Sequence, residues 1–229
     1  ISRTWKSDHT PVTEVDQQIN QLVLDKIKAV FPTHNILAEE GSNLGHQSPY
    51  TWVCDPIDGT FPFMHGIPVS TFTLSLVQDG VPILGIIYDP FQDRLFESVY
   101  GEPTLLTGNP IHTNQSATIK DGTIGVVYWK DNQDFMFPLM DKLAAKGAKF
   151  INLCSIAYMD ALVAAGELTA TIFPGKSAHD SAAAKIVVEG AGGVFTSYHG
   201  LDQRYDAPCD GHLASANIDV HQQILSLLA

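Results

Sequence analysis

Residues 14–30 carry the first regular pattern of hydrophobic and polar positions in the chain, and it is the pattern of an amphipathic helix. The apolar positions recur at helical spacing on one face; they are Val15, Ile19, Leu22, Val23, Ile27 and Val30. Thr13 stands at the N-cap position, and Asp16 three residues later fits a capping arrangement that the helix dipole also favours. We therefore expect a helix from Glu14 to Val30 that is capped by Thr13.

After Pro32 the pattern changes to short apolar runs and to alternation, which are typical of strands. The predicted strands of this part are 35–38, 51–54, 69–78, 81–89 and 94–100. Asp79–Gly80 is a hairpin turn signal between two of them, so the stretch predicts an antiparallel sheet. The first two strands run into acidic residues, Glu39 and Asp55.

From about residue 118 strand and helix patterns alternate, which is typical of an α/β arrangement. The predicted strands are 124–128, 149–153, 168–173 and 213–215, and the predicted helices are 133–146, 155–166, 180–189 and one that ends at Leu228. No low-complexity linker or repeat separates the two parts. We therefore expect two tightly apposed subdomains, residues 1–117 and residues 118–229, with most site residues in the first and Asp180 in the second.

Composition narrows the classes of function. The chain has 229 residues, of which 45% are hydrophobic, and 13 basic residues against 25 acidic ones give a net charge of -12. Such a charge repels nucleic acid and anionic membranes, and no run reaches the roughly twenty apolar residues that span a bilayer. Three distant cysteines form no CxxC pair, which fits a reducing cytoplasm.

The run Asp55-Pro56-Ile57-Asp58-Gly59-Thr60 is the strongest candidate for chemistry. Pro56 fixes a backbone dihedral, and Gly59 permits close approach of the backbone where a new helix could begin. Such a turn aims two carboxylates and the amides of Gly59 and Thr60 at one point, which suits a hard cation and a phosphate ester. The alternative interpretation is a tight acidic loop without a chemical role.

The other acidic positions are ambiguous when each is taken alone. Glu39-Glu40 at a strand end is more often a solvated loop than a ligand, and Asp16 is explained by helix capping. Asp180 opens a predicted helix, where Asp is an ordinary first-turn residue.

Taken together, four motifs resemble the inositol monophosphatase family, and their order and spacing match along nearly the whole chain. They are 11–16 (PVTEVD), 38–40 (AEE), 52–60 (WVCDPIDGT), and 179–183 (HDSAA) with 189–193 (EGAGG). Segments 63–68, 85–90 and 214–217 match as well. The resemblance implies an α/β (α+β) fold, a layered αβαβα sandwich with an N-terminal antiparallel sheet and a C-terminal mixed sheet.

The resemblance also implies a magnesium-dependent, lithium-sensitive phosphomonoesterase with two or three Mg2+ ions. Glu39, Asp55 and the Ile57 carbonyl would hold the first ion, and Asp55, Asp58 and Asp180 the second. A third, weaker ion would share Glu39. A homodimer is implied too.

The family's catalytic roles carry over by position. Glu39 and Thr60 would activate the attacking water, and Asp16 would orient the Thr60 hydroxyl. The expected substrate-binding positions are Asp58, Gly59, Thr60, Ser155 and Phe173. In-line attack by a metal-activated water follows from these roles, because a doubly charged phosphomonoester resists hydroxide until cations neutralise it.

Three positions depart from the family pattern. Pro62 stands where a polar residue is usual, and His179 stands where Trp is usual, neither with an expected metal contact. Phe173 replaces the Glu that binds substrate hydroxyls in inositol monophosphatases. An aromatic ring there could stack on a substrate ring or close the pocket, although core packing is commoner at a strand end.

Several substrates and one non-enzymatic role remain open. Inositol monophosphate leads, whereas 6–13 (KSDHTPVT) also resembles the histidinol-phosphatase branch; fructose 1,6-bisphosphate and 3'-phosphoadenosine compounds are further alternatives. A catalytically inactive binding relative would normally have lost a metal ligand, and all are present. The family has a long helix before this region, so we expect a segment to precede Ile1.

Other site classes fit the sequence poorly. Gly175-Lys176-Ser177 lacks the glycine of a phosphate-binding loop, because Ala170 stands five residues earlier. His179-Asp180 resembles the metal-binding pair of another phosphohydrolase class whose remaining ligands are missing. No G-x-S-x-G elbow for a serine hydrolase is present.

Overall fold

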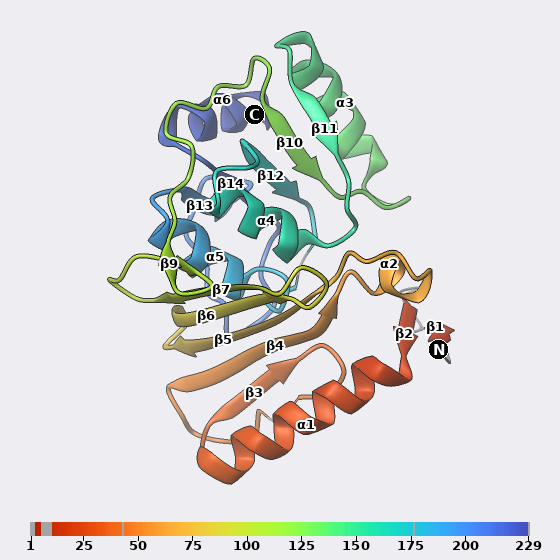
Figure 1. Cartoon of the computed structure of the whole chain (residues 1–229), viewed down its shortest axis with the longest axis vertical. Coiled ribbons are helices and arrows are strands. Elements are labelled where there is room, and N and C mark those ends of the chain that lie inside the picture. Colours follow the sequence, from red (N-terminus) through yellow and green to blue (C-terminus); the bar gives the residue numbers. More distant parts are fainter. Residues whose placement is uncertain (1–2, 6–10, 43, 176, 229) are drawn as a thin grey trace.

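The computed structural model describes residues 3–5, 11–42, 44–175 and 177–228. Its elements stack in five layers, α-β-α-β-α, along the longest axis of the molecule (Figure 1). This is the layered α/β architecture that the sequence predicts. Lys6 to Thr10 and Lys176, named above for their resemblances, lie outside the described residues.

The first sheet contains seven strands in the order of the chain. They are β3 Asn35–Ala38, β4 Tyr50–Asp58, β5 Thr71–Gln78, β6 Val81–Asp89, β7 Arg94–Val99, β8 Leu105–Leu106 and β9 Asn109–Pro110. Neighbouring strands are antiparallel, as predicted, except that β3 runs parallel to β4. A separate short pair joins β1 Arg3–Trp5 to β2 Pro11–Thr13.

Helix α1, Glu14–Val30, covers the outer face of this sheet and has the predicted bounds. The predicted capping box is present: the Thr13 side chain accepts the amides of Val15 and Asp16, and the Asp16 side chain accepts the Thr13 amide. Leu24 and Ile27 are buried against Ile36, Trp52 and Cys54 of the sheet. The cap and the apolar face together fix where Asp16 lies.

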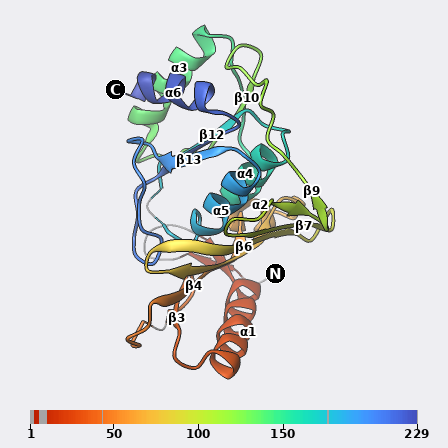
Figure 2. The same ribbon diagram turned by 90° about the vertical axis from the view of Figure 1, so that its left-hand side faces the viewer.

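The second sheet is mixed, as predicted, with the strand order β11-β10-β12-β14-β13. Its strands are β10 Thr123–Val126, β11 Lys149–Ile151, β12 Ala170–Phe173, β13 Val194–Ser197 and β14 His212–Ser215. Two helices, α3 Gln133–Ala145 and α6 Ile218–Leu228, lie together on its outer side (Figure 2). The strand β13 has no counterpart among the predicted elements.

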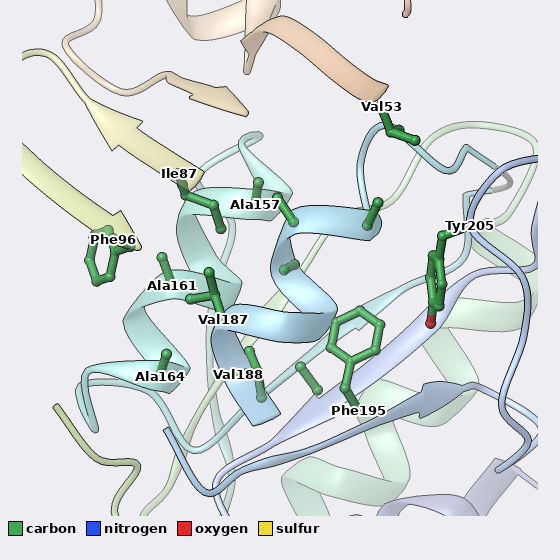
Figure 3. Packing of buried hydrophobic residues seen from close by; sticks show 14 of the residues in the cluster. Val53, Ile87, Phe96, Ala157, Ala161, Ala164, Val187, Val188, Phe195 and Tyr205 are labelled. Carbon is green, nitrogen blue, oxygen red and sulfur yellow. The ribbon is translucent and has the colours of Figure 1, made fainter. Parts of the chain in front are cut away.

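Helices α4, Ile156–Ala164, and α5, Ala182–Gly190, form the middle layer and are buried between the two sheets. Their small residues let the layers approach closely, and Figure 3 shows Ala157, Ala161 and Val187 packed beside Ile87 and Phe96 of the first sheet. The division at residues 117 and 118 falls between β9 and β10 and stays a prediction.

Two element boundaries differ from the prediction near the acidic residues. Strand β4 continues through Pro56 to Asp58 instead of ending at Cys54. A bulge between Asp55 and Asp58 accommodates Pro56 and Ile57 in the ladder with β5. Helix α5 begins at Ala182 with Ser181 as its N-cap, so Asp180 lies in the turn before the helix and not in its first turn.

Among the described residues, no helix combines the length and the apolar character needed to cross a membrane.

Candidate active site

The end of β4 supplies two carboxylates from one irregular stretch of strand. The Asp55 amide donates to Thr73 Oγ1 of β5 (3.2 Å), and Asp55 Oδ1 accepts the Ile57 amide (2.9 Å). Both Asp55 and Asp58 are nearly inaccessible, at 3% and 4% exposure. The bulge thus turns both acids toward the same side of the first sheet.

Glu39 reaches the same place through the parallel pairing of β3 with β4. Ala38 is opposite Cys54 in the ladder, and the Glu39 amide donates to the Cys54 carbonyl (3.1 Å). Glu39 therefore leaves β3 beside Asp55. The one parallel pair in this sheet is what brings the two strand ends together.

Asp58 joins the first sheet to the beginning of α4. Its carboxylate accepts the amides of Ile156 and Ala157 (both 3.0 Å), the Ser155 hydroxyl (2.5 Å) and the Thr71 hydroxyl (3.1 Å). A carboxylate at this place satisfies helix amides that have no partner within the helix and meets the positive end of the helix dipole.

Thr60 begins helix α2, Thr60–Met64, directly after Gly59. Gly59 has a left-handed φ of 92°, and a Cβ there would lie 2.9 Å from the Ser155 Cβ, so glycine is required on both counts. The Thr60 hydroxyl lies 3.2 Å from Asp16 Oδ1 and 3.0 Å from the Ile57 carbonyl oxygen. Asp16 is fully buried, and its other oxygen accepts the Thr13 amide (2.9 Å).

Asp180 comes from the C-terminal half of the chain and completes the group. Ligand atoms of Asp55, Asp58 and Asp180 lie within 4.8 Å of one another, and so do those of Glu39, Asp55 and His179. Asp55 belongs to both sets. Glu39, the pair Asp55 and Asp58, and Asp180 come from three separate segments and meet in one place. Their role as ligands stays a prediction.

Four negatively charged carboxylates so close together would repel one another strongly in the absence of a cation. Burial raises the pKa of Asp55 well above its usual range, and the charges of Glu39, Asp58 and Asp180 raise it further. Burial, with the Asp180 charge, raises the pKa of Asp58 to about 7 despite the hydrogen bond from Ser155. Burial and then the Glu39 charge raise the pKa of Asp180 to about 7. A bound cation would relieve this repulsion.

The acids line one side of a cavity of about 360 Å³ between the two halves of the chain. The lining also includes apolar residues, which are Phe61, Val127, Trp129, Ile156 and Phe173. Among the described residues, no Lys or Arg lines this cavity. Within the described part of the cavity, a phosphate therefore has only cations or backbone amides to balance its charge.

Not every predicted residue faces the cavity. Gly59, Thr60 and Phe173 line it, whereas Asp16 lies behind Thr60, and Ser155 is fully buried with its hydroxyl on Asp58. The Ser155 hydroxyl positions Asp58, and a contact between Ser155 and substrate stays a prediction. Phe173 is only 6% exposed and packs over Gly175, where a Cβ would lie 2.0 Å from its ring.

Several residues of the site were missed by the sequence interpretation. His179 was not expected near a metal, and Thr71 and Thr73 of β5 support Asp58 and Asp55 from the neighbouring strand. The signal for the threonines is their spacing of two, which places both on the same face of β5. Phe61 and Trp129 line the cavity and are 42% and 46% exposed, but neither was part of a motif that the sequence interpretation used.

A buried polar chain lies behind Asp180. Ser181 Oγ is 2.8 Å from His212 Nδ1, His212 Nε2 is 2.9 Å from Asp160 Oδ2, and Asp160 also accepts the Thr171 hydroxyl. All four side chains belong to fully buried residues. The hydrogen bonds follow the order of a Ser-His-Asp catalytic triad, but the buried serine is out of reach of any substrate. The chain of hydrogen bonds anchors the turn that carries Asp180.

Comparison with known proteins gives a consistent match. A sequence model of the inositol monophosphatase family matches residues 2–229. An inositol-1-monophosphatase of Synechocystis sp. is 31% identical over 95% of this chain and 76% of the relative, and a histidinol-phosphatase of Chlorobaculum parvum is 29% identical over 97% and 85%. The solved structure of an inositol monophosphatase from Anabaena (Nostoc) sp. PCC 7120 has a TM-score of 0.85 and 30% identity, covering 95% of this chain and 86% of that one.

Proposed function

The chain belongs to the inositol monophosphatase family and is a phosphomonoesterase, and from this premise we propose that it uses Mg2+ and the cluster Glu39, Asp55, Asp58 and Asp180 to hydrolyse a small phosphorylated metabolite. The observation that carries the proposal is the convergence of these acids in a cavity that no described Lys or Arg lines. The described side chains of such a site repel a doubly charged phosphate, and bound cations would offset this repulsion.

The donor set fits hard divalent cations. Asp55, Asp58 and Asp180 offer carboxylate oxygens, and Ile57, also in the cavity lining, offers a backbone carbonyl in the stretch where the family's first ion is held. We assign the first ion to Glu39, Asp55 and the Ile57 carbonyl, and the second to Asp55, Asp58 and Asp180. When bound, divalent ions supply charge neutralisation of the phosphate, a lowered pKa of the attacking water and stabilisation of the leaving oxygen.

Thr60 and Asp16 orient the attacking water. When the Thr60 hydroxyl donates to Asp16 Oδ1 (3.2 Å), its oxygen is left to accept a hydrogen bond from a water molecule. The buried Asp16 cannot turn away, because its second oxygen is held by the Thr13 amide and hydroxyl. Glu39, at the cavity surface beside Asp55, is placed to take the proton that the water loses.

Gly59 and Thr60 present first-turn amides of α2, which have no partner within a helix and suit phosphate oxygens. We propose inositol monophosphate as the leading substrate, supported by the relative from Synechocystis sp.. A second candidate, histidinol phosphate, is favoured by the aromatic cavity wall of Phe61, Trp129 and Phe173 and by the relative from Chlorobaculum parvum.

The test is phosphate release from a panel of inositol, histidinol, fructose and 3'-adenosine phosphates with Mg2+ titrated. We expect release that depends on the cation, that a chelator abolishes, and that added Mg2+ restores. Lithium inhibition, a homodimer by sedimentation and a cytoplasmic location are further expectations from the family. If the folded protein with Mg2+ released no phosphate from any ester, the proposed activity would be wrong.

A further inference from the structure

His179 lies in the turn between β12 and α5, and this turn is anchored on both sides. Its carbonyl oxygen accepts the Thr73 hydroxyl of β5 (3.3 Å), and the Ala182 amide donates to the Ala178 carbonyl (2.8 Å) across the turn. The His179 side chain is 20% exposed and lines the cavity. Its backbone is therefore tied to the same strand residue, Thr73, that holds the Asp55 amide.

The imidazole lies among the carboxylates. A His179 ring nitrogen, an oxygen of Glu39 and an oxygen of Asp55 are within 4.8 Å of one another. Three donors spaced evenly around one ion at roughly 2.1 Å each lie at most roughly 3.6 Å apart, so side-chain movements of roughly an ångström bring the three onto one ion. Nε2 of His179 lies 3.8 Å from Oδ2 of Asp180, which is longer than a hydrogen bond.

The two sets of donors differ in chemistry. Asp55, Asp58 and Asp180 provide oxygen alone, which suits Mg2+. Glu39, Asp55 and His179 provide two carboxylates and one imidazole nitrogen. Imidazole raises the affinity for first-row transition metals such as Fe2+, Co2+ and Zn2+ and does little for Mg2+, which dehydrates reluctantly and prefers oxygen.

We propose that His179 is a further ligand of the cation held by Glu39 and Asp55, and that it raises the affinity of this position for first-row transition metals beyond what the oxygen donors alone provide, while the position still accepts the Mg2+ proposed above. The inference rests on the metal-dependent function proposed above and concerns one residue of this chain, at a place where the family usually has Trp. The second position, with oxygen donors only, keeps its preference for Mg2+.

Nitrogen ligation is measured on the full chain, without substrate, by electron spin-echo spectroscopy of bound Mn2+. We expect modulation from a directly bound 14N nucleus, which changes to the 15N pattern when the protein is made with 15N-histidine. Absence of nitrogen modulation in the unaltered protein would overturn the proposal. This measurement needs no variant and no turnover, so it is independent of the phosphatase test.

Selectivity is measured by titration calorimetry of Co2+ and of Mg2+ with His179→Gln. We expect Co2+ affinity to fall by about tenfold or more, Mg2+ affinity to change by less than about threefold, and the 14N modulation to disappear. His199→Gln, an exposed histidine outside the cavity, is the matched control and should leave all three unchanged. An unchanged ratio of Co2+ to Mg2+ affinity in His179→Gln would contradict the proposed selectivity.

Discussion

Asp55 is the residue on which both possible metal positions depend, because it is the member shared by the two ligand sets. Asp55→Asn replaces one shared oxygen by an amide nitrogen and removes the negative charge, while the side-chain volume stays nearly the same. We expect turnover to fall by about two orders of magnitude or more, measured as phosphate release at saturating cation.

The fold of this variant should persist, because the remaining oxygen can still accept the Ile57 amide. Circular dichroism and thermal unfolding check this point. Asp141→Asn, an exposed acid on α3, is the matched control and should keep full turnover. Near-normal turnover of a well-folded Asp55→Asn would refute the assignment of Asp55 as a shared ligand.

Asp58 and Asp180 make cation binding dependent on pH. Burial raises the pKa of each to about 7, so without a cation each carboxyl keeps its proton through mildly acidic pH and loses it as the pH rises past about 7. A cation must displace these protons. We therefore expect affinity to weaken by up to about tenfold per displaced proton for each pH unit below 7.

Calorimetry in two buffers with different ionisation enthalpies measures the displaced protons directly. More protons should be released at pH 6.5 than at pH 8, because the carboxyls are already ionised at the higher pH. Binding whose heat is the same in both buffers and whose affinity is the same at both pH values would contradict the raised pKa values.

Residues whose chemistry follows a motif were predictable, and residues placed only by packing were not. Glu39, Asp55, Asp58 and Asp180 follow motifs whose spacing matches a family, and the structure brings them together. His179 differs from the family pattern, so its position among the carboxylates depends on how the turn before α5 packs on β5, which no local pattern encodes.

At the scale of elements, helical periodicity predicted both ends of α1 correctly, whereas the sequence pattern gave a weaker signal for short strands. The strand β13, Val194–Ser197, follows Gly192–Gly193 and has only four residues, too few to show alternation. The extension of β4 through Pro56 was missed because proline normally ends a strand, and only the bulge against β5 accommodates it.

His221 of helix α6 is hydrogen-bonded to the second sheet, and its burial there makes stability dependent on pH. His221 Nε2 is 2.9 Å from Thr196 Oγ1 of β13, and Nδ1 is 3.2 Å from Ser215 Oγ of β14. Burial, with a contribution from Lys185, lowers the pKa of His221 to about 4. The unfolded chain takes up this proton near pH 6.5 but the folded chain only near pH 4, so stability is lost as the pH falls through that interval.

We expect the folded state to lose about 1–3 kcal/mol from this source between pH 7 and pH 4.5. Urea unfolding of the unaltered protein and of His221→Gln at both pH values isolates the effect, because the other titrating groups are common to both. The unaltered protein should lose more stability on acidification than the variant. Equal losses would show that His221 does not carry the dependence.

At the scale of the whole molecule, the order of the layers could be predicted from the order of helix and strand patterns along the chain. The distance between the layers could not. The site needs β4 of the first sheet and the turn before α5 in the middle layer at one place. Gly85 of β6 sets that separation, because a Cβ there would lie 2.4 Å from Ile186 Cγ2 and 2.9 Å from the Ala183 carbonyl oxygen of α5.

Gly85→Ala should therefore push the beginning of α5 away from the first sheet and carry Asp180 away from Asp55. Overpacking of this kind costs about 1–3 kcal/mol, and we expect cation affinity to fall by about tenfold or more because ligand geometry is lost.

Gly193→Ala is the matched control: its Cβ would meet Val188 Cγ1 at 2.7 Å and the Ser215 carbonyl oxygen at 2.9 Å, at the other end of α5 from Asp180. Urea unfolding should show comparable losses for both variants, and calorimetry with Mg2+ and Co2+ should show weaker binding for Gly85→Ala alone. Equal cation affinities in the two variants would mean that the site tolerates the displacement, and that the spacing of the layers serves stability without setting the geometry of the metal ligands.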